Sequence, residues 1–307
     1  MNSALDTNNP FATILNRRSA LKTLGLGALG LGAFSLVGRN TAQAQVAPSP
    51  DIDADILNFA LNLEYLEAEY YVRAVTGKGI DDQGSDSVDV TGTGTLGTVS
   101  IKATPRVRFG YNTLGNYAEE IANDELAHVK FIRAALVSGG FAPVARPAID
   151  LMNSFNAAAV AAGLGKSFDP FASPRNFLLG AFIFEDVGVT AYKAAARLIT
   201  NPDYLEGAAG ILGTEAYHAG TIRTLLYERG AAIRIAVEKI SNLRDAVDGS
   251  DDLDQGIVLD SHANIVPTDA DGLVFSRSVQ QVLNIVYLNA GGTAGGFFPA
   301  GLNGTFA

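Results

Sequence analysis

Two copies of one short motif constrain this chain more than any other feature. Glu-x-x-His occurs at Glu125 and His128 and again at Glu215 and His218, in a sequence of 307 residues that has only three histidines. Both copies fall within long patterns typical of amphipathic helices, in which residues three apart lie side by side on one face. Each motif therefore presents a carboxylate and an imidazole in the same direction.

The surroundings of the two motifs repeat as well. An isoleucine and an arginine follow each histidine at the same spacing, as Ile132 and Arg133 in the first copy and as Ile222 and Arg223 in the second. The matching context indicates that one type of helix is used twice. It predicts a pseudo-two-fold arrangement of the helices.

Two further helical patterns carry single glutamates within apolar runs. Glu64 is followed seven residues later by Tyr71, and Glu185 is followed seven residues later by Tyr192. Seven residues make two helical turns, so each glutamate shares a helix face with its tyrosine. A buried carboxylate without a partner costs on the order of several kcal/mol, so these glutamates need a cation or a hydrogen-bond network. Glu67 shares the face of Glu64 and is the alternative candidate there.

These residues make up one glutamate from each of two helices plus Glu-x-x-His from each of two others. That donor set is typical of four-helix bundles that hold two iron or two manganese ions. Four carboxylates with neutral histidines balance the charge of two divalent ions, and the absence of cysteine excludes thiolate ligands. We predict a pair of Fe or Mn ions with Glu125 and Glu215 bridging. The predicted ligands are Glu64, Glu125, His128, Glu185, Glu215 and His218.

The two tyrosines and the remaining polar neighbours lie beside this predicted site. Tyr71 and Tyr192 are candidate catalytic residues, either as core residues with a satisfied hydroxyl or as hydrogen-bond donors to a ligand carboxylate. Glu69 is expected at the solvated surface. Asp124 and Asp186, which neighbour ligands, are expected either at the surface, which is favoured, or as hydrogen-bond partners behind the ligands.

The order of the helical patterns predicts an all-α fold. Two helices, a long crossover and two more helices form the topology of a ferritin-like four-helix bundle. We place the bundle in residues 45–230, with an insertion at 77–110 between the first two helices. A C-terminal extension of helices and loops, residues 231–307, is expected to pack on the bundle. The helices are expected over residues 51–74, 111–138, 173–200 and 203–229.

The first 44 residues indicate an export signal. Arg17 and Arg18 precede a glycine- and alanine-rich apolar run, and a small-residue cleavage pattern ends at Ala44. The apolar run is too short and too rich in glycine for the alternative, a membrane anchor. We predict a cleaved twin-arginine signal over residues 1–44, a periplasmic or extracellular location, and no stable membrane span afterwards. The net charge of −10 argues against nucleic-acid binding.

Several segments resemble the exported ferritin-like family that includes the plant desiccation-related proteins and their bacterial relatives. The resemblance covers most of residues 51–300 and is carried by the segments 61–71, 124–129, 184–186, 215–218, 281–289 and 295–299.

The resemblance implies the fold and the di-metal site but is a poor guide to activity. The first hypothesis is a redox enzyme whose di-metal centre reacts with peroxide or oxygen during oxidative or desiccation stress. Whether the centre turns over is left open, and so are iron versus manganese and assembly into a homo-oligomer. The alternatives are a metal-binding stress protein without turnover, a metal-free polar network, and metal storage in a cage. The insertion at 77–110 argues against the cage.

Overall fold

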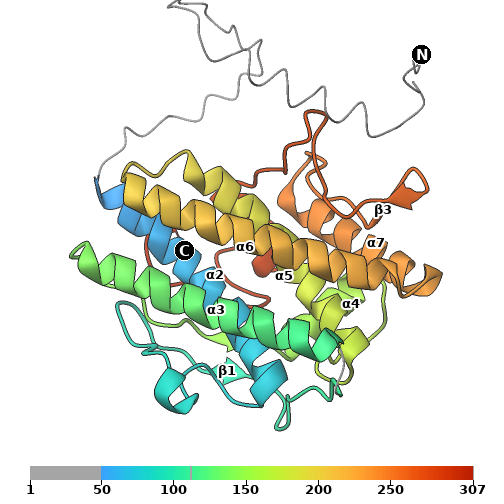
Figure 1. Cartoon of the computed structure of the whole chain (residues 1–307), viewed down its shortest axis with the longest axis horizontal. Helices are drawn as coiled ribbons and strands as arrows, with labels where there is room; N and C mark the ends of the chain where they lie inside the picture. Colours follow the sequence, from blue (N-terminus) through green and yellow to red (C-terminus); the bar gives the residue numbers. More distant parts are fainter. Residues whose placement is uncertain (1–49, 111–112, 307) are drawn as a thin grey trace, which may run out of the picture. The chain divides into compact units, whose positions relative to one another are not determined.

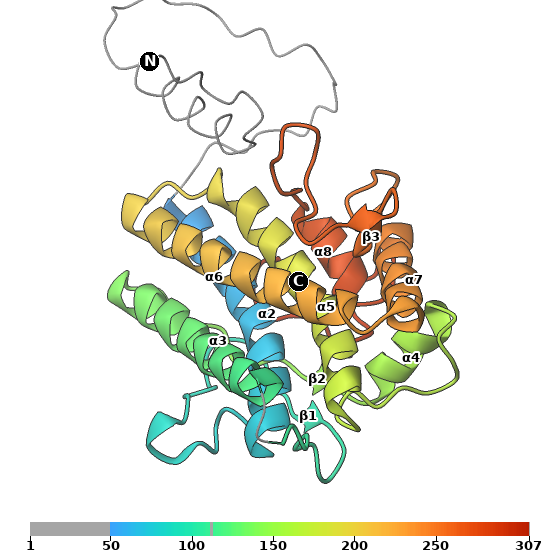
Figure 2. The ribbon, with the colours of Figure 1, turned by 45° about the vertical axis from the view of Figure 1, so that its right-hand side comes forward.

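The computed structural model describes residues 50–110 and 113–306, so the predicted export signal lies outside the described residues. Four long helices form the bundle, and α2 packs along α3 while α5 packs along α6 (Figures 1 and 2). The all-α fold and its ferritin-like topology are as expected from the sequence. The bundle helices are α2 (Pro50–Thr76), α3 (Thr113–Ser138), α5 (Pro174–Ala196) and α6 (Pro202–Tyr227).

Local sequence explains where α5 and α6 begin. The Ser173 side chain accepts a hydrogen bond from the Asn176 amide, and a proline occupies the first turn of α5. The Asn201 side chain accepts from the Asp203 amide at the start of α6, where a proline again follows the cap. Proline fits the first helical turn because its missing N–H would have no partner there.

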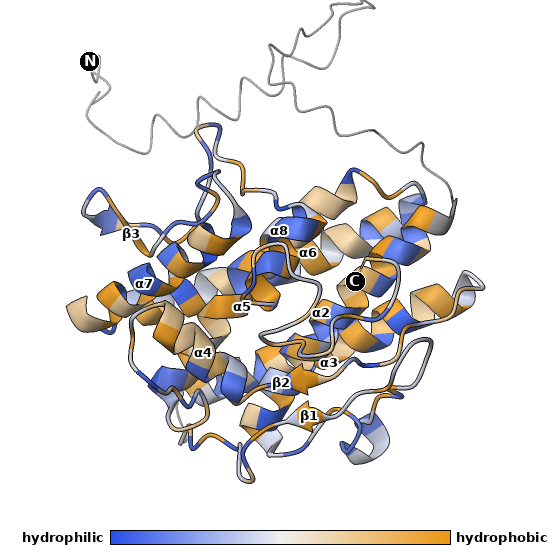
Figure 3. Cartoon of the chain, turned by 180° about the vertical axis from the view of Figure 1, so that it is seen from behind, coloured by the Kyte–Doolittle hydropathy of each residue, from blue (hydrophilic) through white to orange (hydrophobic). Residues whose placement is uncertain are grey.

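The α5 helix lies in the interior of the fold. Every residue from Phe177 to Tyr192 is buried, and the helix is mostly hydrophobic around its circumference (Figure 3). A helix that is apolar on all sides is covered on all sides. The few polar side chains on α5, among them Glu185 and Asp186, therefore lie in a dry environment and need partners.

The insertion between α2 and α3 pairs with the crossover and forms no hairpin of its own among its described residues. The short strand β1 (Val99–Ser100) lies parallel to β2 (Ile149–Asp150), which belongs to the connection between α3 and α5. The insertion also contains a 3-10 turn, η1 (Gly84–Asp86), and the crossover contains α4 (Asn153–Ala161). Both segments thus cover the same end of the bundle.

The C-terminal residues return to the bundle helices. The extension contains α7 (Ala231–Asp248), the antiparallel strands β3 (Val258–Leu259) and β4 (His262–Ala263), and α8 (Val279–Val286). Both α7 and α8 pack against α5. None of the helices in the described part of the chain is long and apolar enough to cross a membrane.

Asp53 joins the start of α2 to the turn between α5 and α6. Its buried carboxylate accepts hydrogen bonds from the Thr200 amide at 2.8 Å, the Thr200 hydroxyl at 2.9 Å and the Asn201 amide at 2.8 Å. Asp53→Ala leaves these donors without a partner, so we expect the free energy of unfolding to fall by about 3 kcal/mol. Urea denaturation measures this loss. Asp82→Ala, which removes an exposed ion pair with Lys78, should cost much less, and equal losses would contradict this role of Asp53.

Candidate metal centre

The bundle brings all six predicted ligand residues together in its core. Each carboxylate is at most 1% exposed, and the two imidazoles are buried. The glutamates come from one position on each of the four helices, and the histidines lie one turn further along α3 and α6. The six are Glu64 on α2, Glu125 and His128 on α3, Glu185 on α5, and Glu215 and His218 on α6.

These side chains form two overlapping groups that could each hold a metal ion. In the first, one ligand atom each from Glu64, Glu125, His128 and Glu215 lies within 4.8 Å of the others. The second consists of Glu125, Glu185 and His218 by the same measure. Glu125 belongs to both groups, which is the position a bridging carboxylate takes. Glu215 belongs to the first group alone.

Both imidazoles turn the same nitrogen toward the carboxylates. His128 Nδ1 lies 3.2 Å from Glu64 Oε2 and 3.5 Å from Glu125 Oε2. His218 Nδ1 lies 3.0 Å from Glu125 Oε1. On its other side, His218 Nε2 contacts Asp124 Oδ2 at 3.2 Å, so that carboxylate fixes the orientation of the ring.

Apart from the imidazole–carboxylate contacts, the inward-facing atoms of this cluster have no partners. Buried polar atoms are normally paired, so a concentration of unpaired ones marks a place where something else binds. Four carboxylates around one point also repel each other, and a cation removes both penalties. The residues therefore fit a pair of metal ions. Within the described residues the unpaired cluster atoms are Glu64 Oε2, both oxygens of Glu125, His128 Nδ1, Glu185 Oε2, both oxygens of Glu215, and His218 Nδ1.

Two tyrosines hold the outer oxygens of two of these carboxylates. The Tyr71 hydroxyl donates to Glu185 Oε1, and the Tyr192 hydroxyl donates to Glu64 Oε1. Each tyrosine thus reaches across from its own helix to the glutamate of the other, because α2 and α5 run antiparallel. The contact leaves Oε2 of each glutamate free and directed toward the cluster.

A family model for the ferritin-like domain matches residues 52–228 of this chain, which include all six of these residues. The chain belongs to the ferritin-like domain family. It is similar to the desiccation-related protein PCC13-62 of Craterostigma plantagineum, with 30% identity over 76% of this chain and 77% of that protein. It is also similar to the ferritin-like catalase Nec2 of Nesocodon mauritianus, with 26% identity over 84% and 85% of the two chains. No solved structure matches it.

Two acidic residues of this ferritin-like domain lie elsewhere than the sequence predicts. Glu69, expected at the solvated surface, is fully buried and forms ion pairs with Arg73 and Arg146. Asp186, also expected at the surface, is buried between Arg223 and Arg244. In both cases at least one arginine partner that makes burial tolerable comes from a distant part of the chain, Arg146 for Glu69 and Arg244 for Asp186.

Asp124 is partly exposed, as expected, but contacts His218. The arginine of the repeated Ile-Arg pair also has a structural role that the sequence did not predict. Arg133 donates to the Tyr65 hydroxyl and Arg223 to Asp186, so each arginine contacts the residue that follows the glutamate on the neighbouring helix.

Glu67 adds a fifth buried carboxylate and lies outside both metal groups. Burial and then the charges of Glu125, Glu185 and Glu64 raise its pKa well above the usual range. Its counterpart on α5, three residues after the glutamate, is Gly188. The side chain missing at that glycine leaves the space that Glu215 and Glu67 occupy.

Gly188 is expected to be essential for the cluster. A Cβ atom there would lie 2.3 Å from Glu215 Oε2, so Gly188→Ala must displace that carboxylate. We expect the variant to lose binding of at least one Mn²⁺ per chain, measured by isothermal titration. Gly210→Ala is the matched control, because its Cβ on α6 meets nothing within 4 Å. The control should bind metal normally and gain about 0.5–1 kcal/mol of stability. Unchanged metal binding in Gly188→Ala would contradict the expected displacement of the Glu215 carboxylate by the added Cβ atom.

The charges of the cluster predict how the metal-free protein responds to pH. Burial disfavours a charged imidazole, but Glu185 and Glu125 raise the pKa of His218 to about 9. Similarly, Glu64 and Glu125 raise the pKa of His128 to about 11. Burial raises the pKa of Glu185 to about 8, whereas for Glu125 the close contacts with His128 and His218 outweigh burial and lower its pKa to about 2.

Raised pKa values mean that the folded metal-free protein holds protons that the unfolded chain releases. The stabilisation by His218 is complete below its ordinary value of 6.5 and is lost as the pH rises through about 9. The raised pKa of Glu185 makes the free energy of unfolding fall steadily as the pH rises from 4.5 to about 8. We therefore expect the Tm of chelator-treated protein to fall between pH 6 and pH 9, by calorimetry. Metal affinity should rise over the same range because binding displaces these protons. A Tm that rises toward pH 9 would contradict the assignment.

Proposed function

We propose that this chain is an exported ferritin-like protein whose core holds two Fe or Mn ions that react with peroxide or oxygen. In this role it would protect against oxidative or desiccation stress. The observation that carries the proposal is the set of unpaired inward-facing oxygen and nitrogen atoms on six buried residues. Within the described cluster these atoms contact one another only through the two imidazoles, at 3.0–3.7 Å from the carboxylates, too few contacts to pair the inner oxygens of four buried glutamates without metal.

The protein residues supply binding, orientation and protection from water. Glu125, which belongs to both groups, would bridge the two ions, and Glu64, His128, Glu185 and His218 would hold one ion each. The bridging role predicted for Glu215 stays a prediction, because Glu215 belongs to one group alone. Tyr71 and Tyr192 keep the outer oxygens of Glu185 and Glu64 occupied, so the inner oxygens stay directed at the ions. When bound, the redox-active ions supply the electron exchange with the oxidant.

Small molecules would reach the cluster between α3 and α6. The His128 and His218 side chains are 10% and 6% exposed, whereas the cluster carboxylates are at most 1% exposed. Asp124 lies on the same side and is partly solvated. Its negative charge attracts metal cations to the side where the imidazoles meet solvent.

Peroxide disproportionation is the reaction with the simplest requirements. Two peroxide molecules give two water molecules and one oxygen molecule, so no separate electron donor is needed. The similarity to a protein named as a ferritin-like catalase supports this choice. The predicted signal over residues 1–44 supports export, on the basis of sequence alone.

The second candidate is a metal-binding stress protein without turnover. The similarity to a desiccation-related protein at 30% identity favours it. In that case the metal pair mainly stabilises the fold, because a ligand that binds only the native state shifts the unfolding equilibrium. Chelation would then lower the Tm while peroxide is left unconsumed.

Elemental analysis and peroxide assays on protein from its native host test the first candidate. We expect two Fe or Mn ions per chain and oxygen release from peroxide. Glu125→Ala should lose both ions and the activity, since Glu125 belongs to both groups, and His218→Ala should lose one ion. Glu120→Ala, an exposed position on the same helix, should change neither property. Metal without turnover would leave the second candidate, and no metal at all would overturn both.

A further inference from the structure

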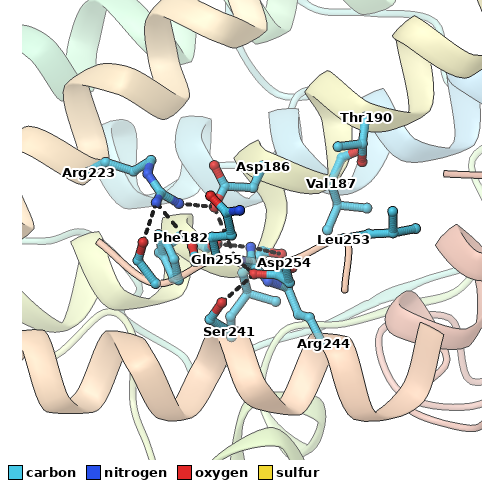
Figure 4. A network of polar contacts seen from close by, with 12 residues as sticks. Phe182, Asp186, Val187, Thr190, Arg223, Ser241, Arg244, Leu253, Asp254 and Gln255 are labelled. Atoms are coloured by element: carbon cyan, nitrogen blue, oxygen red, sulfur yellow. Dashed lines mark hydrogen bonds and ion pairs between the residues drawn. The ribbon is translucent and has the colours of Figure 1, made fainter. Parts of the chain in front are cut away.

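Three fully buried arginines lie behind the metal cluster. Arg223, Arg244 and Arg277 are at most 1% exposed and rank among the largest fully buried side chains of the described residues. Arginine is almost never fully buried unless its charge is paired. Each is paired here with buried aspartates, and Figure 4 shows the part of this network around Arg223 and Arg244. The network joins α5, α6, α7 and the loop that follows α7.

Asp254 is the centre of this network. It accepts hydrogen bonds from the Ser241 hydroxyl at 2.6 Å, from Arg244 Nη2 at 2.6 Å and from Arg277 Nη2 at 2.7 Å. Asp254 lies in the loop after α7, about seventy residues from Glu185 in the sequence. We define Arg244, Asp254 and Arg277 as the clamp.

The clamp contacts a single stripe of α5. Arg244 Nη1 donates to the Phe182 carbonyl at 2.5 Å, and Arg244 Nη2 contacts Asp186 at 3.0 Å. Arg277 Nη1 donates to the Thr190 hydroxyl at 3.0 Å. Phe182, Asp186 and Thr190 are four residues apart, so they lie along one side of the helix. Glu185 and Tyr192, on an adjacent side, face the metal cluster.

Arg223 connects this stripe to the helix that carries His218. Its Nη1 contacts Asp186 Oδ2 at 2.7 Å, and its other donors bond the carbonyls of Gln255, Gly256 and Asn264. Asp186 thus receives one arginine from α6 and one from α7. The carboxylate next to Glu185 is therefore held by two arginines, both through its oxygen Oδ2.

The other half of the bundle is held by different contacts at the matching positions. Arg133, the counterpart of Arg223, donates to the Tyr65 hydroxyl and pairs with Asp89, whose side chain is 66% exposed. This exposed pair is screened by water and holds α3 only weakly, whereas the buried Glu69 of α2 pairs with Arg73 and with Arg146 of the crossover. The clamp contacts α5, so it acts on the half that supplies Glu185 and His218.

We propose that Asp186 is a positioning residue for Glu185, and that the clamp acts through it to form the ion position of Glu125, Glu185 and His218. The inference rests on the proposed function, in that it requires the cluster to bind metal. Glu185 is repelled by the neighbouring carboxylates, and a fixed α5 keeps it in place until an ion arrives. Partners behind the ligands of a metal commonly tune its affinity by about 10- to 100-fold.

Titration of the full-length, metal-free protein with Mn²⁺ tests the clamp. In Asp254→Asn we expect one of the two equivalents to bind at least about tenfold more weakly, and the other to change less than about threefold. Asp53→Asn is the matched control: it alters a buried aspartate with three hydrogen bonds at the far end of α2. Both variants should lower the Tm, but the control should bind two equivalents as the wild type does.

Arg277→Lys gives a second, milder test should Asp254→Asn fail to fold. It keeps the charge but loses the fork of donors to Asp248, Thr190 and Asp254, so it should weaken the same equivalent about threefold. The visible spectrum of Co²⁺ bound to that position should shift, while the other position keeps its spectrum. Two equivalents of wild-type affinity in both variants would overturn the clamp alone. Wild-type protein that binds no metal would overturn the proposed function as well.

Discussion

Four carboxylates meet in the core of this bundle without enough positive charge around them. Their mutual repulsion and their removal from water both oppose folding, and the two imidazoles offset only part of this cost. Much of the local structure follows from that constraint. Tyr71 and Tyr192 occupy two outer oxygens, Asp124 holds one imidazole, and Gly188 leaves room for a carboxylate that a side chain would displace.

The same protein shows what buried charge looks like when it is structural. Glu69 is as buried as any cluster glutamate, but Arg73 and Arg146 pair with it. The buried carboxylate of Asp254 is likewise paired, because it accepts hydrogen bonds from Ser241, Arg244 and Arg277. Burial alone therefore does not identify a site. Burial together with unpaired atoms does, and among the carboxylate clusters of the described residues that combination is concentrated where the four bundle helices meet.

The sequence was sufficient for the bundle and for its six central residues because both depend on spacing within single helices. Glu125 and His128 share a face wherever their helix is placed, and the repeat at Glu215 and His218 indicates that the two faces meet. Contacts between distant segments are different. Arg73 lies one helical turn from Glu69, a spacing that the sequence does encode, but Arg146 and Arg244 come from segments 77 and 58 residues away from Glu69 and Asp186, and no helical period encodes those pairings. The favoured surface positions of Glu69 and Asp186 were wrong for this reason.

The pseudo-two-fold symmetry that made the site recognisable is also incomplete, and its exceptions fall beside the ligands. In the repeat, Glu67 on α2 corresponds to Gly188 on α5, and Asp124 on α3 corresponds to Thr214 on α6. The Thr214 hydroxyl donates to the Gly210 carbonyl of its own helix instead of contacting an imidazole. Each exception changes charge or space on one side only. Two ions bound in such a site would experience different fields, because one would lie toward His218, which Asp124 contacts, and toward the clamped α5, while the other would lie toward Glu64 and His128. If the pair is redox-active, as proposed, this difference would give electrons and protons a preferred direction between otherwise similar positions.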